Sequence, residues 1–130
     1  MRIEIETIPD DEQKYPTVGD WWFTDNNDFE GESLQIRVSD MGNWKYELLV
    51  AFHELAEVML CRDRGISTKT VDNFDKKFEQ ARKKGNTEEP GFDSKAPYRK
   101  EHTFATAVEM LLAEQLNVDW KKYDNTVNKL

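Results

Sequence analysis

The chain is poor in cysteine, because Cys61 is the only one among its 130 residues. A single thiol cannot form a disulfide within the chain, which excludes a small disulfide-stapled fold and favours a reducing compartment. No apolar run reaches the ~18 residues that span a bilayer. The first residues, MRIEIETIPDDEQ, alternate charge with isoleucine and lack the apolar block of a signal peptide. We therefore expect a cytoplasmic protein that does not use a membrane as partner.

Basic residues are fewer than acidic ones. The sequence has 18 Lys and Arg against 26 Asp and Glu, which gives a formal net charge of -8. A field of this sign repels phosphate backbones and anionic lipid, so nucleic acid is not an expected partner. The length is that of one domain with one core. We predict a single domain over residues 1–130.

The first third of the chain, residues 1–42, has the pattern of strands. RIEIETI and SLQIRVSDMG alternate apolar and polar residues with a period of two, and DWWFTD is a short aromatic segment next to turn-forming residues. Three strands so close in sequence predict a small antiparallel sheet. The adjacent rings of Trp21, Trp22 and Phe23 either form a binding surface or place two of their number in the core.

Residues 43–130 are predicted to be mostly helical. The first helix follows Asp40 or Asn43 as N-cap and is apolar nearly all round, which is typical of a helix in the middle of a domain. Further helices are expected in VDNFDKKFEQARKK, YRKEHTFATAVEMLLAEQL and DWKKYDNTVNKL, with a polar, Gly- and Pro-rich surface loop over residues 85–97. The expected fold class is α+β, a three-stranded sheet packed against the central helix and two to three further helices.

Three polar residues interrupt the apolar segment LLVAFHELAEVMLC: His53, Glu54 and Glu57. Burying an isolated carboxylate costs several kcal/mol unless it is paired, protonated or bound to a metal. His53 and Glu57 are four residues apart, so on a helix both project from one face and can bind one cation. Glu54 lies about 100° around the helix and can reach a water on that cation. This order is that of H-E-x-x-H with Glu57 in place of the second His.

A cation needs a third protein ligand, and the only other histidine is His102. It falls in the third predicted helix, with Glu109 two turns later on the same face. His53, Glu57 and His102 together make a two-His, one-carboxylate set, the ligand count of a hydrolytic zinc that keeps one position open for water. Glu109 is a candidate for orienting one of these ligands or replacing it.

A small sheet followed by a helix with HELAE resembles the minimal zincin-like metallopeptidase fold, mainly over residues 34–61, and the whole chain is similar to phage and prophage proteins with the same block. The resemblance implies a zinc ligand at His53, the general base at Glu54, and the place of the second His at Glu57. A carboxylate there makes Mn²⁺ or Fe²⁺ plausible beside Zn²⁺. The implied reaction is peptide or amide hydrolysis, in the host cytoplasm if the chain is phage-encoded.

A second enzyme class uses Glu-x-x-Glu on paired helices. The all-α nucleotide pyrophosphohydrolases of the MazG type bind Mg²⁺ with four acidic groups, and Glu54 and Glu57 match half of that pattern. The other half requires Glu-x-x-Asp on a facing helix, yet neither Glu109 nor Glu114 has an acid three residues later. A strand-rich first third is also foreign to such bundles.

A third hypothesis has no catalysis. His53, Glu57 and His102 would then form a buried polar network or a structural metal site, since buried networks fix a unique packing without doing chemistry. A plainer alternative to a metal site is that Glu54 or Glu57 simply pairs with Arg62, Lys45 or Arg99 at the helix surface.

Overall fold

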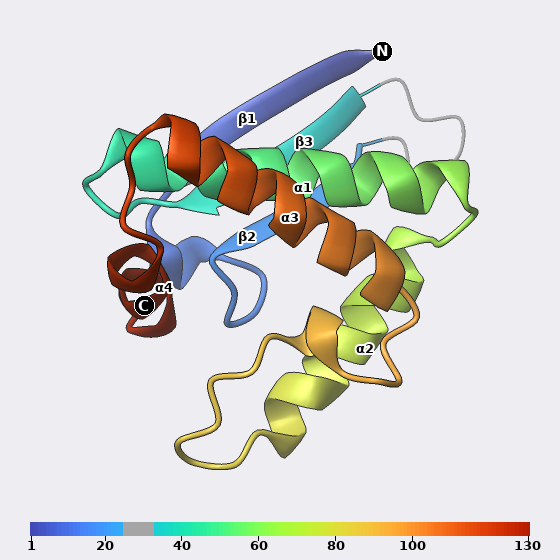
Figure 1. The fold of residues 1–130 in the computed structure, drawn as a ribbon. Helices are drawn as coiled ribbons and strands as arrows, with labels where there is room; N and C mark the ends of the chain where they lie inside the picture. Colours follow the sequence, from blue (N-terminus) through green and yellow to red (C-terminus); the bar gives the residue numbers. More distant parts are fainter. Residues whose placement is uncertain (25–32) are drawn as a thin grey trace.

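The computed structural model describes residues 1–24 and 33–130 and has an α+β architecture, a three-stranded sheet with helices stacked on one of its faces (Figure 1). No helix in the described part is long and apolar enough to cross a membrane. In chain order the elements are β1 (Arg2–Ile8), the 3₁₀ helix η1 (Asp10–Glu12), β2 (Gly19–Phe23), β3 (Ser33–Ser39), α1 (Trp44–Asp63), α2 (Thr68–Ala81), the 3₁₀ helix η2 (Pro90–Phe92), α3 (Arg99–Gln115) and α4 (Trp120–Asn128).

The sheet is mixed, with the strand order β1-β3-β2. β2 pairs antiparallel with β3, but β1 pairs parallel with it. The prediction of an antiparallel sheet is therefore wrong for one of the two strand pairs. The physical reason is burial: Leu34, Ile36 and Val38 have no exposed surface, so β3 takes the centre and separates the two strands that precede it. Closeness in sequence did not reveal this order.

The strand ends differ slightly from the predicted ones. β3 stops at Ser39, before the predicted end at residue 42, and β2 stops at Phe23. Residue 25, where the predicted second strand ended, lies outside the described residues. Trp21 and Phe23 are 3% and 4% exposed, so two of the three adjacent aromatic rings lie in the core, the second of the two predicted outcomes.

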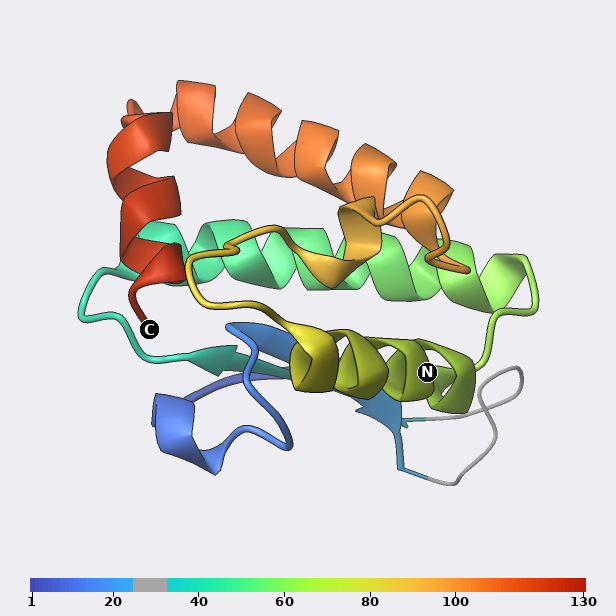
Figure 2. The same ribbon diagram turned by 90° about the horizontal axis from the view of Figure 1, so that it is seen from below.

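Helix α1 runs through the middle of the domain, as predicted. Figure 2 shows it between the sheet and α3, both of which it contacts. Asn43 caps its N-terminus, because the Asn43 side chain accepts hydrogen bonds from the backbone N–H groups of Lys45 and Tyr46. Leu49 and Val58 are fully buried against the sheet. Each such side chain stabilises the fold by about 1.5–3 kcal/mol, which makes α1 a rigid base for its polar residues.

Three further α-helices complete the fold, together with two short 3₁₀ helices that the sequence did not predict. Ser67 caps α2 and Asp119 caps α4. The predicted loop over residues 85–97 contains η2, which packs against both α2 and α3 and buries Gly91. This segment therefore covers one side of the helical layer instead of standing clear in solvent (Figure 2).

Candidate metal centre

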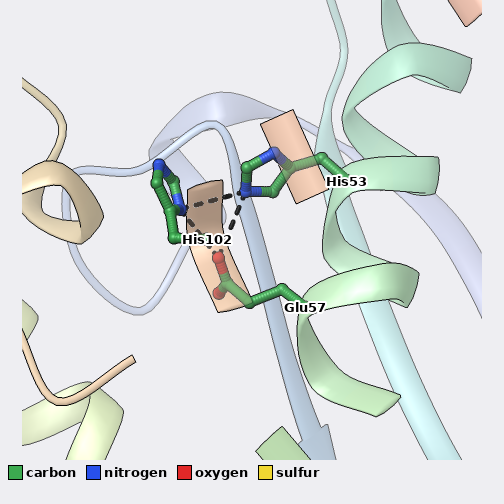
Figure 3. A group of neighbouring side chains, drawn as sticks. All are labelled: His53, Glu57 and His102. Atoms are coloured by element: carbon green, nitrogen blue, oxygen red, sulfur yellow. Dashed lines mark hydrogen bonds and ion pairs between the residues drawn. The ribbon is translucent and has the colours of Figure 1, made fainter. Parts of the chain in front are cut away.

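Three donor atoms from two helices converge inside the domain (Figure 3). Helix α1 supplies His53 and Glu57 from one face, one turn apart, and α3 supplies His102 from the opposite side. The distance from His53 Nε2 to His102 Nδ1 is 3.1 Å, that from His102 Nδ1 to Glu57 Oε2 is 2.8 Å, and that from His53 Nε2 to Glu57 Oε2 is 3.2 Å. The three residues predicted as ligands are thus brought together.

This triangle has nearly the size that a small divalent cation requires. Zinc bonds to nitrogen and oxygen are about 2.0–2.1 Å long, so two ligands of a tetrahedral site are separated by about 3.3–3.4 Å. The sides measured between His53, Glu57 and His102 fall a few tenths of an ångström short of that value. Small side-chain rotations suffice to open the triangle, and the residues present therefore fit a cation.

The second nitrogen of each imidazole is held by a carboxylate. His53 Nδ1 lies 2.9 Å from Glu109 Oε1, and His102 Nε2 lies 2.6 Å from Glu89 Oε2. Tyr123 donates its hydroxyl hydrogen to the other oxygen of Glu109. Carboxylates in this position fix the tautomer and ring direction of metal-binding histidines and strengthen them as ligands. The arrangement leaves His53 Nε2 and His102 Nδ1 as the two ring nitrogens that face Glu57.

Proton counting leads to the same assignment. Without a cation, each ring donates one N–H to Glu109 or Glu89, so a hydrogen bond across the 3.1 Å between His53 Nε2 and His102 Nδ1, or from either nitrogen to Glu57, needs a second proton on one ring. At least one imidazolium ion is then buried in the cluster. With a cation in the triangle, His53 and His102 are neutral, each keeps one N–H for Glu109 or Glu89, and no two donors face each other.

The electrostatics of the buried cluster follow from the same contacts. Burial lowers the pKa of His102, but its hydrogen bonds to Glu57 and Glu89 outweigh burial and raise that pKa to about 9. The pKa of His53 is likewise lowered by burial and raised, well above its ordinary value, by Glu109 and Glu57. Burial raises the pKa of Glu57, yet the hydrogen bonds from both rings bring it down to about 2. The protein alone thus holds an ionised Glu57 facing two protonated rings.

Glu54, the predicted base, is 9% exposed and lies beside the cluster on α1. Among the described residues its carboxylate has no hydrogen-bond partner, and it lines the same cavity as the three predicted ligands. Burial, followed by the nearby charge of Glu57, raises the pKa of Glu54 well above its ordinary value. Gly19 makes room for it, since a Cβ at Gly19 would lie 2.6 Å from Glu54 Oε1.

A cavity of about 370 Å³ opens next to the cluster. Its wall is formed by α1 and α3, by β2, by the segment that follows α2, and by α4. Carboxylates dominate this wall: Arg82 is the one Lys or Arg among the described residues that line it, and Glu79 neutralises Arg82 through two hydrogen bonds. The cavity is large enough for a small molecule or a short peptide segment, and its charge disfavours anions.

The segment after α2 supplies a residue that sequence reasoning missed. Glu89 was assigned only to a surface loop, and nothing in its spacing linked it to His102. Close packing holds the segment in place: a Cβ at Gly91 would lie 2.2 Å from His102 Cγ, and the Phe92 ring meets the His102 ring edge to face at 4.6 Å. Arg82 secures the other end by donating to the Glu88 carbonyl oxygen at 2.9 Å. Trp21 and Tyr123, which donate to Glu57 and Glu109, were also missed.

The alternative in which Glu54 and Glu57 pair with Lys or Arg at a helix surface is wrong. Both carboxylates are buried, and in the described part of the chain neither forms an ion pair with a Lys or Arg. Glu57 instead accepts hydrogen bonds from Trp21 and from the two imidazoles.

Fold and site together define a candidate metal centre on an α+β scaffold. Comparison with protein-family models, with curated proteins and with solved structures finds no match for the chain. The zincin-like and phage-protein resemblances are therefore hypotheses that depend on the residues alone.

Proposed function

We propose that the chain is a metal-dependent hydrolase in which His53, Glu57 and His102 bind a divalent cation. Zn²⁺ is the first candidate because two imidazoles and one carboxylate are a common donor set of catalytic zinc, and Mn²⁺ or Fe²⁺ also suits a site with a carboxylate ligand. The observation that carries the proposal is the triangle of donor atoms with sides of 2.8–3.2 Å, in which each imidazole has its other nitrogen held by a carboxylate.

The proposed reaction is hydrolysis of a peptide or amide bond. A cation at this site supplies a Lewis acid, which polarises a carbonyl and makes a water more acidic. Glu54 is suited to accept the proton of the attacking water, because its carboxylate borders the cavity without a hydrogen-bond partner in the described chain and its pKa is raised. Glu109 and Glu89 keep the rings of His53 and His102 in place.

Two features support this hydrolase over the MazG-type alternative. Histidines, not only carboxylates, form the donor triangle, and histidine suits zinc better than Mg²⁺. The carboxylates that line the cavity would also repel the phosphate groups of a nucleoside triphosphate, except where Mg²⁺ neutralises their charge. Release of pyrophosphate from nucleoside triphosphates is nevertheless the direct assay of that alternative.

A structural metal site is the second candidate. It is favoured by burial, since His53, Glu57 and His102 are 6%, 5% and 7% exposed, as expected of ligands closed off from substrate. In that case the cation stabilises the packing of α1 on α3 and no bond is cleaved.

Hydrolysis by the wild-type protein and its loss in Glu54→Gln separate these two candidates, because a structural site cleaves no bond in either protein. Under the hydrolase proposal this variant keeps its cation, while hydrolysis of fluorogenic peptide or amide substrates falls by about 10²–10⁴-fold. Glu114→Gln, which removes an exposed carboxylate on α3, is the matched control and should retain activity. Loss of the cation from Glu54→Gln would make Glu54 a ligand. Unchanged hydrolysis in this variant would remove Glu54 from the mechanism.

A further inference from the structure

Helix α1 is apolar apart from its polar cluster and its ends, yet within residues 1–24 and 33–130 one side of it is only partly covered. Phe52 is 41% exposed, and Leu48, Leu55 and Met59 on the same side are only half-buried, although Leu55 and Met59 also pack against the core. A helix that is apolar on every side normally lies entirely inside a protein. The polar cluster accounts for the buried side of α1, but it does not account for this open one.

Helix α3 extends the open apolar surface. Phe104 and Leu111 are 56% and 66% exposed, and Val108 lies between them at the spacing that keeps all three on one side of a helix. The ring centroids of His53 and His102 are 4.6 Å apart, so α1 and α3 lie side by side at these two residues. Phe52 and Phe104, one and two residues away in sequence, therefore lie at similar heights along the helix pair. We name the combined surface the α1/α3 face; its members are Trp44, Leu48, Phe52, Leu55, Met59, Phe104, Val108 and Leu111.

We propose that the α1/α3 face is the interface with a second copy of this chain. Trp44, Phe52 and Phe104 are 64%, 41% and 56% exposed, and large aromatic side chains have areas on the order of 150–250 Å², so these three expose about 300 Å². The aliphatic members add a similar amount, which gives roughly 1,200 Å² for two copies, the lower end of a specific interface. A monomer seldom leaves so large an apolar surface open.

The apolar area makes a second copy the occupant that we propose, and the charge distribution allows it. No member of the α1/α3 face is charged, although the Lys45 ammonium lies 5.9 Å from the centroid of the Trp44 ring at its edge, while the chain carries a net charge of -8. Many of the carboxylates belong to α2, to the segment after it and to the cavity wall, and Figure 2 shows α2 and that segment on the near side of the ribbon. Two copies joined through the α1/α3 face keep these acidic sides apart. An uncharged face made of two helices also suits a two-fold contact, in which four helices pack together.

The test is the oligomeric state of the full chain. Light scattering with size-exclusion chromatography should give a mass about twice the 15.3 kDa of one chain. Combining Phe104→Glu with Leu111→Glu should produce a monomer, and the uncharged variant Phe104→Ser should raise the dissociation constant at least tenfold. Met110→Glu is the matched control, because Met110 is also exposed on α3 but points about 100° away from Leu111, and this variant should stay dimeric.

A monomeric wild-type protein at every concentration would overturn the proposal, as would a dimer that survives both substitutions in α3. A dimer lost equally in Met110→Glu would place the interface elsewhere. Metal content, measured in the same samples, should not change in any of these variants, so the outcome is independent of the proposed hydrolase. Circular dichroism checks that each variant is folded.

Discussion

The imidazole of His53 and the carboxylate of Glu109 are joined by a 2.9 Å hydrogen bond between Nδ1 and Oε1, across the contact of α1 and α3. Tyr123 of α4 donates a hydrogen bond to the other oxygen of Glu109. Helix α4 therefore holds the Glu109 carboxylate in place, and this carboxylate orients the His53 ring. These contacts orient the ring so that His53 Nε2 forms one corner of the donor triangle. Glu109, which lies outside the donor triangle, thereby controls the geometry of one of its members.

Glu109→Gln should therefore weaken metal binding without removing it. The amide oxygen still accepts the N–H of His53, but the negative charge that strengthens the ring as a ligand is lost. We expect the dissociation constant for Zn²⁺ to rise about 10–100-fold. Titration against a chromophoric chelator measures this change. Glu114→Gln on the same helix is the control, and equal affinities in the two variants would contradict the role of Glu109.

Gly91→Ala tests the packing of the covering segment on His102. The added Cβ would lie 2.2 Å from Cγ of the ring, so the ring or the segment must move. Overpacking of this kind costs about 1–3 kcal/mol, and the shifted ring should also bind the cation less tightly. Gly42→Ala is the control: its backbone φ of +66° makes the substitution costly, but no atom lies within 4 Å of the new Cβ. Thermal unfolding and metal titration should show that only Gly91→Ala loses affinity.

Metal binding should release protons. In the metal-free protein the pKa of His102 is about 9 and that of His53 is raised well above its ordinary value, so both rings carry an extra proton at pH 7. A cation binds only neutral imidazoles, and about two protons should leave for each cation bound. Calorimetry at pH 7 in buffers of different ionisation enthalpy counts them. The affinity should increase as the pH rises, and binding without proton release would contradict the assigned ligands.

The stability of the metal-free protein should also depend on pH. The pKa of His102 rises on folding from 6.5 to about 9, so its stabilising contribution is complete below pH 6.5 and is lost as the pH rises through 9. The pKa of Glu57 falls from 4.5 to about 2, so its contribution is present above pH 4.5 and is lost as the pH falls through 2. Both contributions are complete between roughly pH 4.5 and 6.5.

Denaturant unfolding of the chelator-treated protein should show the His102 contribution as a decrease of up to about 3 kcal/mol between pH 6.5 and 9. The His102→Ala variant should lack most of this decrease. A wild-type protein whose stability does not change over this range would argue against the hydrogen bonds from His102 to Glu57 and Glu89.

Much of the site could be predicted from the sequence because helical spacing is local. The four-residue step from His53 to Glu57 and the seven-residue step from His102 to Glu109 each fix a shared helix face. The scarcity of histidine then left one partner for His53. The structure brings these four side chains together, while the metal and the hydrolysis stay predictions.

What the sequence could not reveal depends on contacts between distant segments. The parallel pairing of β1 with β3 follows from which strand is most deeply buried, and each strand's own alternation is the same in either direction. Glu89 belongs to a segment without periodicity, so only the packing of Gly91 and Phe92 on the His102 ring reveals its role. The sequence also did not predict the exposed side of α1, because a helix that is apolar nearly all round is expected to be buried on every side.

The central claim is that His53, Glu57 and His102 share one divalent cation, and elemental analysis tests it most directly. Protein purified without a histidine tag should contain about one zinc, manganese or iron ion per chain. His53→Ala and His102→Ala should each lose this ion, while Glu114→Gln should keep it. A wild-type protein that contains no such ion and takes up none on dialysis against Zn²⁺, Mn²⁺ or Fe²⁺ would contradict the account.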